Sequence, residues 1–136
     1  MIKLNEILLI DDNEADNFLH EMVIKDTNCC EKVVIMESAI DALAYLKSVD
    51  TLGKHPQPDL IFLDINMPAM NGWEFLDEYE KLADNQKGKI VVIMLTTSLN
   101  PKDLEKSKEI GYVGDFKNKP LTQETLSVIL ENYFPE

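Results

Sequence analysis

Short aliphatic runs alternate along the chain with longer segments in which apolar residues recur at helical spacing, and this happens five times. The runs predict five β-strands, at Glu6–Ile10, Lys32–Met36, Leu60–Leu63, Ile90–Leu95 and Tyr112–Phe116. Four of them lack in-and-out alternation, which is typical of strands buried on both faces of a parallel sheet. Strict alternation of strands with helices predicts an α/β fold, in which helices cover both faces of one parallel sheet.

Four of the predicted helices begin at a capping side chain followed, three residues later, by an acidic residue. The pairs are Asn13 with Asp16, Ser38 with Asp41, Asn71 with Glu74, and Asn100 with Asp103. Helical spacing in the first helix predicts an apolar core face made of Phe18, Leu19, Met22 and Val23. The fourth helix carries only Leu104 and Ile110 as large apolar residues, so we expect it to be docked least firmly.

The length of 136 residues corresponds to one domain, so we expect residues 1–136 to form a single domain. No segment approaches the ~18 consecutive apolar residues of a membrane span, which predicts no membrane insertion. The first residues, MIKLNE, lack the apolar core of a signal peptide. These features predict a cytoplasmic protein.

Acidic residues outnumber basic ones by 25 to 13, and every basic residue is a lysine. Nucleic-acid binding relies on basic side chains that neutralise phosphates, with arginine favoured at base edges, so the composition argues against direct DNA binding. An acidic surface instead suits divalent cations or basic protein surfaces. The two cysteines, Cys29 and Cys30, are adjacent, and we expect two free thiols in a reducing compartment.

Polar side chains follow four of the predicted strands, and such positions share one edge of a parallel sheet. They are Asp11, Asp12, Asp64, Thr96 and Lys119. Two carboxylates about 4 Å apart repel by ~4 kcal/mol at an effective dielectric constant of 20, so three together favour binding of a cation. Magnesium prefers oxygen ligands and commonly takes one or two carboxylates together with a substrate phosphate. The ammonium of Lys119 and the hydroxyl of Thr96 suit phosphoryl oxygens.

Asp64 is the best candidate for a nucleophile in this group. It stands alone at the end of the strand DLIFLD, whereas Asp11 and Asp12 are adjacent and are left to hold the metal. A carboxylate can attack phosphorus to form an acyl phosphate, and such a transfer depends mainly on positioning and charge neutralisation.

Four motifs now carry a family resemblance: LLIDD at 8–12, PDLIFLDINMPAMNGWEFL at 58–76, IVVIMLTTS at 90–98 and FKNKP at 116–120. In this order and spacing the chain resembles the receiver domain of two-component response regulators (CheY-like), from Glu6 to Glu131. The resemblance implies a flavodoxin-like (βα)5 fold, doubly wound, with strand order 2-1-3-4-5. It also implies a stand-alone single-domain type without an output domain.

By this resemblance Asp64 accepts a phosphoryl group from a sensor histidine kinase or a histidine phosphotransfer protein. Magnesium, or manganese in its place, is bound by Asp12, Asp64 and the main-chain carbonyl of Asn66, with Asp11 acting through a water molecule. Lys119 pairs with Asp64 before phosphorylation and with the phosphoryl group afterwards. The Lys119–Pro120 peptide bond is expected to be cis.

The resemblance also implies a switch in which Thr96 moves towards the phosphoryl group and the ring of Phe116 moves inward. Thr97 follows directly, and we choose Thr96 because it lies nearest the strand end. The output surface is expected on the fourth helix, fifth strand and fifth helix, where it would contact a target protein or a second copy of the chain. Apart from self-phosphorylation and autodephosphorylation, no enzyme activity is expected.

Two alternatives come from other classes of protein. Haloacid-dehalogenase-like phosphatases also form an aspartyl phosphate, but they resemble one another in a D-x-D signature after the first strand, where this chain has Asp11-Asp12-Asn13. A flavin or nucleotide binder needs a glycine-rich or hydroxyl-rich loop there. We expect His20 and His55 to be structural or exposed, and Trp73 to be a partly exposed surface aromatic.

Overall fold

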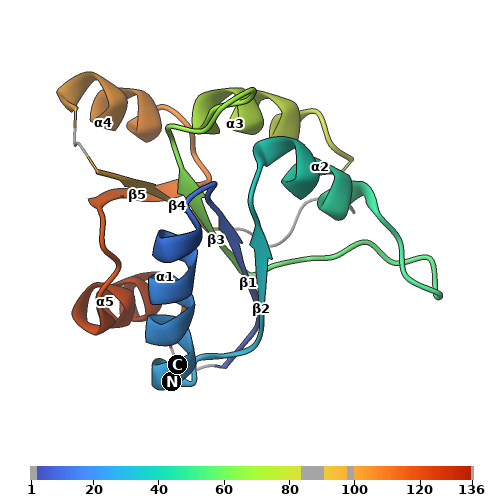
Figure 1. The fold of residues 1–136 in the computed structure, drawn as a ribbon, viewed down its shortest axis with the longest axis horizontal. Helices are drawn as coiled ribbons and strands as arrows, with labels where there is room; N and C mark the ends of the chain where they lie inside the picture. Colours follow the sequence, from blue (N-terminus) through green and yellow to red (C-terminus); the bar gives the residue numbers. More distant parts are fainter. Residues whose placement is uncertain (1–2, 84–90, 98–99, 136) are drawn as a thin grey trace.

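The computed structural model describes residues 3–83, 91–97 and 100–135, in which five strands alternate with five helices (Figure 1). The strands are β1 (Leu4–Ile10), β2 (Cys30–Met36), β3 (Leu60–Asp64), β4 (Val91–Thr96) and β5 (Val113–Asn118). The helices are α1 (Glu14–Thr27), α2 (Ala39–Lys47), α3 (Gly72–Glu80), α4 (Pro101–Lys108) and α5 (Gln123–Tyr133). Every predicted strand is present, although Ile90, the first residue of the predicted fourth strand, lies outside the described residues.

The strands form one parallel sheet in the order β2-β1-β3-β4-β5, which confirms the predicted flavodoxin-like topology. β3 lies at the centre, and all five of its residues are buried. Ile10 of β1 is the register partner of Leu63 of β3. The next residues along the two strands, Asp11 and Asp64, therefore emerge at the same edge of the sheet.

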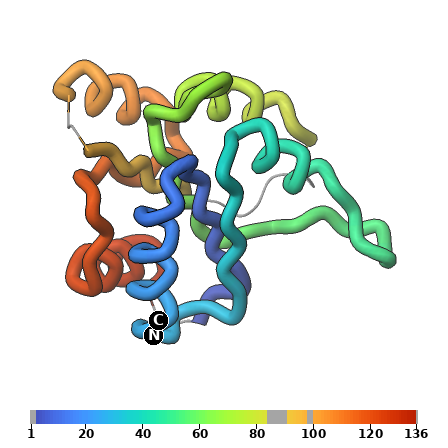
Figure 2. Tube along the Cα trace, in the orientation of Figure 1, coloured from blue at the N-terminus to red at the C-terminus, as the bar shows by residue number. Residues whose placement is uncertain are grey.

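Two layers of helices cover the sheet (Figures 1 and 2). α1 and α5 pack on one face, where Ile24, Leu126 and Ile129 join one core cluster. α2 and α3 pack on the other face in a second cluster, against which Leu104 of α4 also packs. Successive residues of the central strands alternate between the clusters, as the pleat of a β-strand requires. The sequence pattern predicted this arrangement of helices on both faces.

The predicted core face of α1 is wrong. Phe18 is 65% exposed, Met22 46% and Leu19 40%, and of the four predicted residues Val23 alone packs against the core. The helix is therefore rotated relative to the orientation that its apolar residues predict.

Polar side chains occupy the inner face of α1 instead. Asn17 and His20 are buried together with Ile24. The Nδ2 of Asn17 donates to the carbonyl of Asp11 at 2.8 Å, and the Nε2 of His20 accepts the backbone N–H of Leu121 at 3.2 Å. These bonds fasten the helix to the loops after β1 and β5, and a count of apolar residues cannot detect them. His20 is structural, as predicted.

α3 begins directly against the end of β3. Its N-cap, Asn71, and Glu74 form a reciprocal capping box, and the N–H of Gly72 donates to the carbonyl of Ile65 at 2.8 Å. A Cβ atom at Gly72 would lie 2.9 Å from the main-chain oxygen of Asp64. Only glycine permits this approach, which fixes the backbone that carries Asp64.

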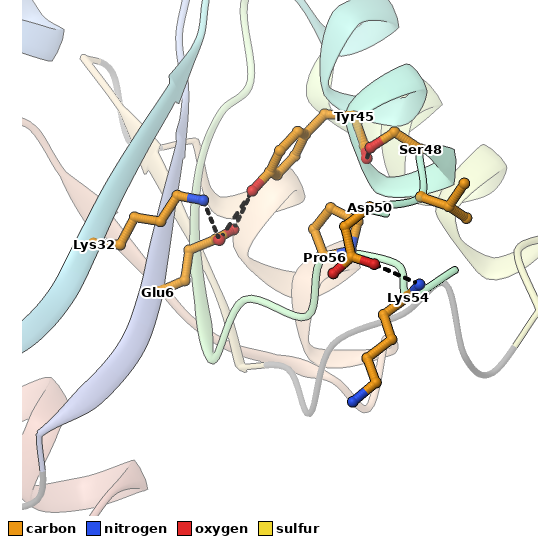
Figure 3. Close-up of a pocket in the computed structure, with 8 residues that line it drawn as sticks. Glu6, Lys32, Tyr45, Ser48, Asp50, Lys54 and Pro56 are labelled. Atoms are coloured by element: carbon orange, nitrogen blue, oxygen red, sulfur yellow. Dashed lines mark hydrogen bonds and ion pairs between the residues drawn. The ribbon is translucent and has the colours of Figure 1, made fainter. Parts of the chain in front are cut away.

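The long connection between α2 and β3 lies at the amino edge of the sheet, opposite Asp11 and Asp64 (Figure 1). There Glu6 is 8% exposed, and the Tyr45 hydroxyl lies 2.9 and 3.0 Å from its two carboxylate oxygens (Figure 3). The Nζ of Lys32 lies 3.7 Å from the same carboxylate. A cavity of about 250 Å³ opens beside these residues.

α4 buries the fewest residues of the described helices, in line with its few large apolar residues. Ser107 is its one buried residue, while Leu104 is half-buried. No helix within the described ranges is long and apolar enough to cross a membrane.

Candidate functional site

Three carboxylates converge at the carboxyl edge of the sheet. Asp11 and Asp12 follow β1 directly, and Asp64 ends β3. Each offers an oxygen that lies within 4.8 Å of the others' oxygens. Asp11 is 4% and Asp64 6% exposed, whereas Asp12 faces solvent. The structure thus brings together the three acids that the strand ends predicted.

The donor set of this cluster suits a hard divalent cation. Carboxylate oxygens are the ligands that magnesium and manganese prefer, and burial of two of the three raises the cost of leaving their charges uncompensated. The acids open onto a cavity of about 340 Å³. Its lining residues are Asp11, Asp12, Asn13, Asp16, Asp64, Asn66, Thr97 and Lys119.

Lys119 is the cation in this cluster of acids. Its Nζ lies 2.6 Å from Oδ2 of Asp11, 2.8 Å from Oδ2 of Asp16 and 3.4 Å from Oδ1 of Asp64. Burial disfavours its charged form, but the hydrogen bonds to Asp11 and Asp16 outweigh that effect and hold the pKa of Lys119 above its ordinary value. The side chain is therefore a fixed ammonium at neutral pH.

The backbone of Lys119 is also fixed. Its N–H donates to the carbonyl of Thr96 at 2.7 Å, which joins the ends of β5 and β4. The Lys119–Pro120 peptide bond is cis, the isomer that the resemblance implies.

Asp16 is a site residue that the sequence did not predict. Its position three residues after Asn13 suggested only a role at the helix start, and its N–H does donate to Oδ1 of Asn13. Its carboxylate, however, lines the cavity and contacts Lys119. The available signal was position, since Asp16 lies in the first turn of α1, directly after the loop that carries Asp11 and Asp12, and lines the same cavity.

The pKa of Asp64 is raised to about 6. Burial is the main cause, and the negative charge of Asp11 adds to it, while Lys119 acts in the opposite direction. Burial therefore disfavours the ionised, nucleophilic form of Asp64 unless a cation compensates its charge. The elevated value measures how poorly its charge is compensated.

The two threonines at the end of β4 differ in their surroundings. Thr96 is 2% exposed, and strand alternation places its side chain on the sheet face that holds Met94 and Phe116. Thr97 is exposed and lines the cavity. The choice of Thr96 as the phosphoryl contact stays a prediction, supported by its shared face with Phe116.

Phe116 is already buried, at 4% exposure, and its register partner is Met94. Its ring stacks with that of Trp73 at a centroid distance of 6.5 Å. The Nζ of Lys106, on α4, lies 4.7 Å from the centre of the Trp73 ring. Trp73 is half-buried, as predicted, but the contacts through it from β5 to α4 were not predicted.

The model of the response regulator receiver domain family matches residues 7–131 of this chain. The chain belongs to this family. The match covers the last four residues of β1, the other four strands and the cluster of acids, and it confirms the resemblance carried by the four sequence motifs.

Individual receiver proteins agree with this assignment. Response regulator Rcp1 of Synechocystis sp. is 35% identical over 104 residues, which cover 76% of this chain and 69% of that protein. The two-component response regulator ARR17 of Arabidopsis thaliana is 32% identical over 120 residues, or 85% of this chain and 75% of that protein.

Solved receiver structures share the fold. A two-component response regulator from Cytophaga hutchinsonii superposes with a TM-score of 0.88 at 32% identity, covering 98% of this chain and 99% of that one. The Mn2+-bound form of Rcp1 has a TM-score of 0.72 at 30% identity, covering 97% and 95%. These similarities identify a receiver domain of two-component signalling and do not favour a haloacid-dehalogenase-like phosphatase.

Proposed function

We propose that this receiver domain accepts a phosphoryl group on Asp64 in a reaction that needs magnesium, or manganese in its place. The observation that carries the proposal is the position of the Asp64 carboxylate. It lies in an open cavity, 3.4 Å from the ammonium of Lys119 and within 4.8 Å of oxygens from Asp11 and Asp12. A nucleophile, a phosphoryl-binding cation and metal ligands are thus in mutual reach.

Asp12, Asp64 and the main-chain carbonyl of Asn66 would hold the metal ion, with Asp11 acting through a water molecule. The bound ion would neutralise charge on the transferred phosphoryl group and align it with Asp64. Support comes from the uncompensated charge of the acids, from their oxygen donors, and from the position of Asn66 in the cavity lining. Rcp1, a similar receiver, has a Mn2+-bound form.

In the transfer, an oxygen of Asp64 forms a bond to phosphorus while the bond from phosphorus to the imidazole nitrogen of the donor breaks. The electron pair of the broken bond stays with the imidazole. Lys119 then pairs with a phosphoryl oxygen, which supplies the charge neutralisation that such a transfer requires. Attack by water on phosphorus later breaks the bond to the Asp64 oxygen, releases inorganic phosphate and returns Asp64 to its carboxylate form. We propose no reactions beyond self-phosphorylation and autodephosphorylation.

We propose a sensor histidine kinase or histidine phosphotransfer protein as the donor, in the cytoplasm. Output would pass from Thr96 and Phe116 to the α4-β5-α5 surface, which would contact a target protein or a second copy of the chain. The stack of Phe116 on Trp73, with Lys106 over the same ring, supports this route because it joins β5 to α4, a helix with a single buried residue. A net charge of −12 without arginine argues against direct DNA contact.

The test is a mass measurement. The protein is incubated with acetyl phosphate and magnesium, and intact mass should show one acid-labile phosphate. This phosphate should not form when EDTA is present from the start of the incubation. Asp64→Asn should stay unmodified. Asp59→Asn is the matched control, because this acid precedes the opposite end of β3, and it should be modified like the wild type.

Two results would contradict the proposal: an unmodified wild type, or a phosphate that persists on Asp64→Asn. Steady release of phosphate from many phosphomonoesters would support a phosphatase instead.

A further inference from the structure

We infer that Asp16 is a positioning residue that holds the ammonium of Lys119 on the α1 side of the site. A phosphoryl group on Asp64 must therefore draw the ammonium away from Asp16. This inference rests on the proposed function of Asp64. It assigns to Asp16 a role in setting how tightly, and for how long, the site holds a phosphoryl group.

The contacts of Lys119 carry the first step. An ammonium has three N–H donors, and three carboxylates surround this one. The distances are unequal, because the bonds to Asp11 and Asp16 are 2.6 and 2.8 Å whereas the distance to Asp64 is 3.4 Å. The ammonium is therefore drawn towards Asp11 and Asp16 and makes its weakest contact with the proposed phosphoacceptor.

The second step is that Asp16 is held in place by its helix. Its backbone N–H donates to Oδ1 of Asn13, and the next residue, Asn17, is buried and donates to the carbonyl of Asp11. The first turn of α1 is thus tied to the same loop that carries the metal ligands. The Asp16 carboxylate is presented to Lys119 by a fixed helix turn and not by a free loop.

The third step concerns which contact yields when a phosphoryl group arrives. Within the described residues, the hydrogen bonds of Nζ go to Asp11 and Asp16 and hold it 3.4 Å from Asp64, so the ammonium must move away from one of these two acids to bind a phosphoryl oxygen on Asp64 closely. The side chain of Asp16 is 30% exposed, against 6% for Asp11 and 8% for Asp64, so water can most readily satisfy the Asp16 oxygen once it is released. Asp16 therefore competes with the phosphoryl group for Lys119 and weakens its binding.

The experiment measures binding of beryllofluoride, a phosphoryl mimic, to the full chain by calorimetry in the presence of magnesium. Asp16→Asn should bind it more tightly by roughly threefold to tenfold, the range expected when a competing, partly exposed charged hydrogen bond is removed. After acetyl phosphate treatment, this variant should also lose its phosphate more slowly than the wild type.

Two variants are the controls. Glu14→Gln removes the same charge from the same helix turn, but Glu14 is exposed and Lys119 pairs with Asp16. It should bind beryllofluoride within about twofold of the wild type, since exposed charges contribute little. Asp16→Glu keeps the carboxylate and should restore affinity towards the wild-type value.

A structural readout separates positioning from a general effect on folding. In a structure of Asp16→Asn, the distance from Nζ of Lys119 to Oδ1 of Asp64 should fall below 3.4 Å. An unchanged distance, or an affinity equal to that of wild type or of Glu14→Gln, overturns the inference alone. A wild type that does not bind beryllofluoride overturns the proposed function and this inference together.

Discussion

The two edges of the sheet each hold a buried carboxylate beside a lysine and a cavity, yet their charge balance differs. At the amino edge, the described residues that line the cavity include two acids, Glu6 and Asp50, and two lysines, Lys32 and Lys54 (Figure 3). At the carboxyl edge, the described lining includes four acids and one lysine. The acids are Asp11, Asp12, Asp16 and Asp64, and the lysine is Lys119.

The comparison separates a structural polar cluster from the proposed functional one. Glu6 is satisfied by the Tyr45 hydroxyl and by Lys32, so the cluster at the amino edge is complete without a ligand. The carboxyl edge keeps an excess of negative charge in a partly buried place, which is costly unless a cation binds. We therefore take uncompensated charge, and not the presence of a cavity, as the mark of the functional site.

Removing the lysine that pairs with the buried acid at each edge should give the largest difference in the free energy of unfolding. Lys119→Met leaves several acids without their cation, two of them buried, and should lower the free energy of unfolding by about 3 kcal/mol in EDTA at pH 7.5. Lys32 is 62% exposed, so Lys32→Met should cost less than about 1 kcal/mol. Urea unfolding measures both, and equal losses would refute the contrast.

Neutralising a carboxylate should change the free energy of unfolding in opposite directions at the two edges. Without divalent cations at pH 7.5, Asp64→Asn should raise the free energy of unfolding by up to about 3 kcal/mol, because burial raises the pKa of Asp64 from 3.8 to about 6. Glu6→Gln should lower it by about 1 kcal/mol, since it weakens the bonds from Tyr45 and Lys32. A loss in both variants would contradict this account.

The gain from Asp64→Asn should depend on pH. Because the pKa of Asp64 is higher in the folded protein, the charge of Asp64 lowers the free energy of unfolding, and it does so by the full amount above about pH 6. As pH falls from 6 towards 3.8 the folded protein takes up the proton first, the penalty shrinks, and the variant should lose its advantage. Urea unfolding at several pH values between 4 and 8 checks this window, and a pH-independent gain would contradict the stated cause.

Magnesium should stabilise the carboxyl edge selectively. At ten times its Kd, magnesium should add about 1.4 kcal/mol to the free energy of unfolding of the wild type. Asp12→Asn removes a proposed ligand and should show a smaller gain at the same concentration, whereas Glu6→Gln should show the full gain. Thermal unfolding with and without magnesium makes the comparison, and equal gains in all three proteins would place the metal elsewhere.

A small effect should come from the hydroxyl at the amino edge. Tyr45→Phe removes the donor to Glu6 and should cost about 1 kcal/mol. It should leave the rate of phosphorylation by acetyl phosphate unchanged, because the carboxyl edge does not depend on it. A slower reaction in this variant would show that the two edges are coupled.

Much of the fold follows from local sequence features. The runs ILLI and LIFL predicted buried central strands, and Asn13, Ser38, Asn71 and Asn100 predicted helix starts that the structure contains. Because the ends of parallel strands must meet at one edge, the convergence of Asp11, Asp12, Asp64 and Lys119 could be predicted as well.

The remaining features depend on three-dimensional contacts between side chains. The inner face of α1 could not be predicted, because Asn17 and His20 are buried by bonds to backbone groups of distant loops. Asp16 was missed because its partner, Lys119, lies 103 residues away. The stack of Trp73 on Phe116 likewise joins α3 to β5 without a sequence signal.

The most direct test of the central claim identifies the residue that carries the phosphate. The protein is phosphorylated with acetyl phosphate and magnesium and reduced with borohydride, which converts an aspartyl phosphate to homoserine, and its peptides are analysed by mass spectrometry. Homoserine should replace aspartate at Asp64 and at no other acid. Reduction at Asp11, Asp12 or Asp16, or no reduced residue in a phosphorylated sample, would contradict the account.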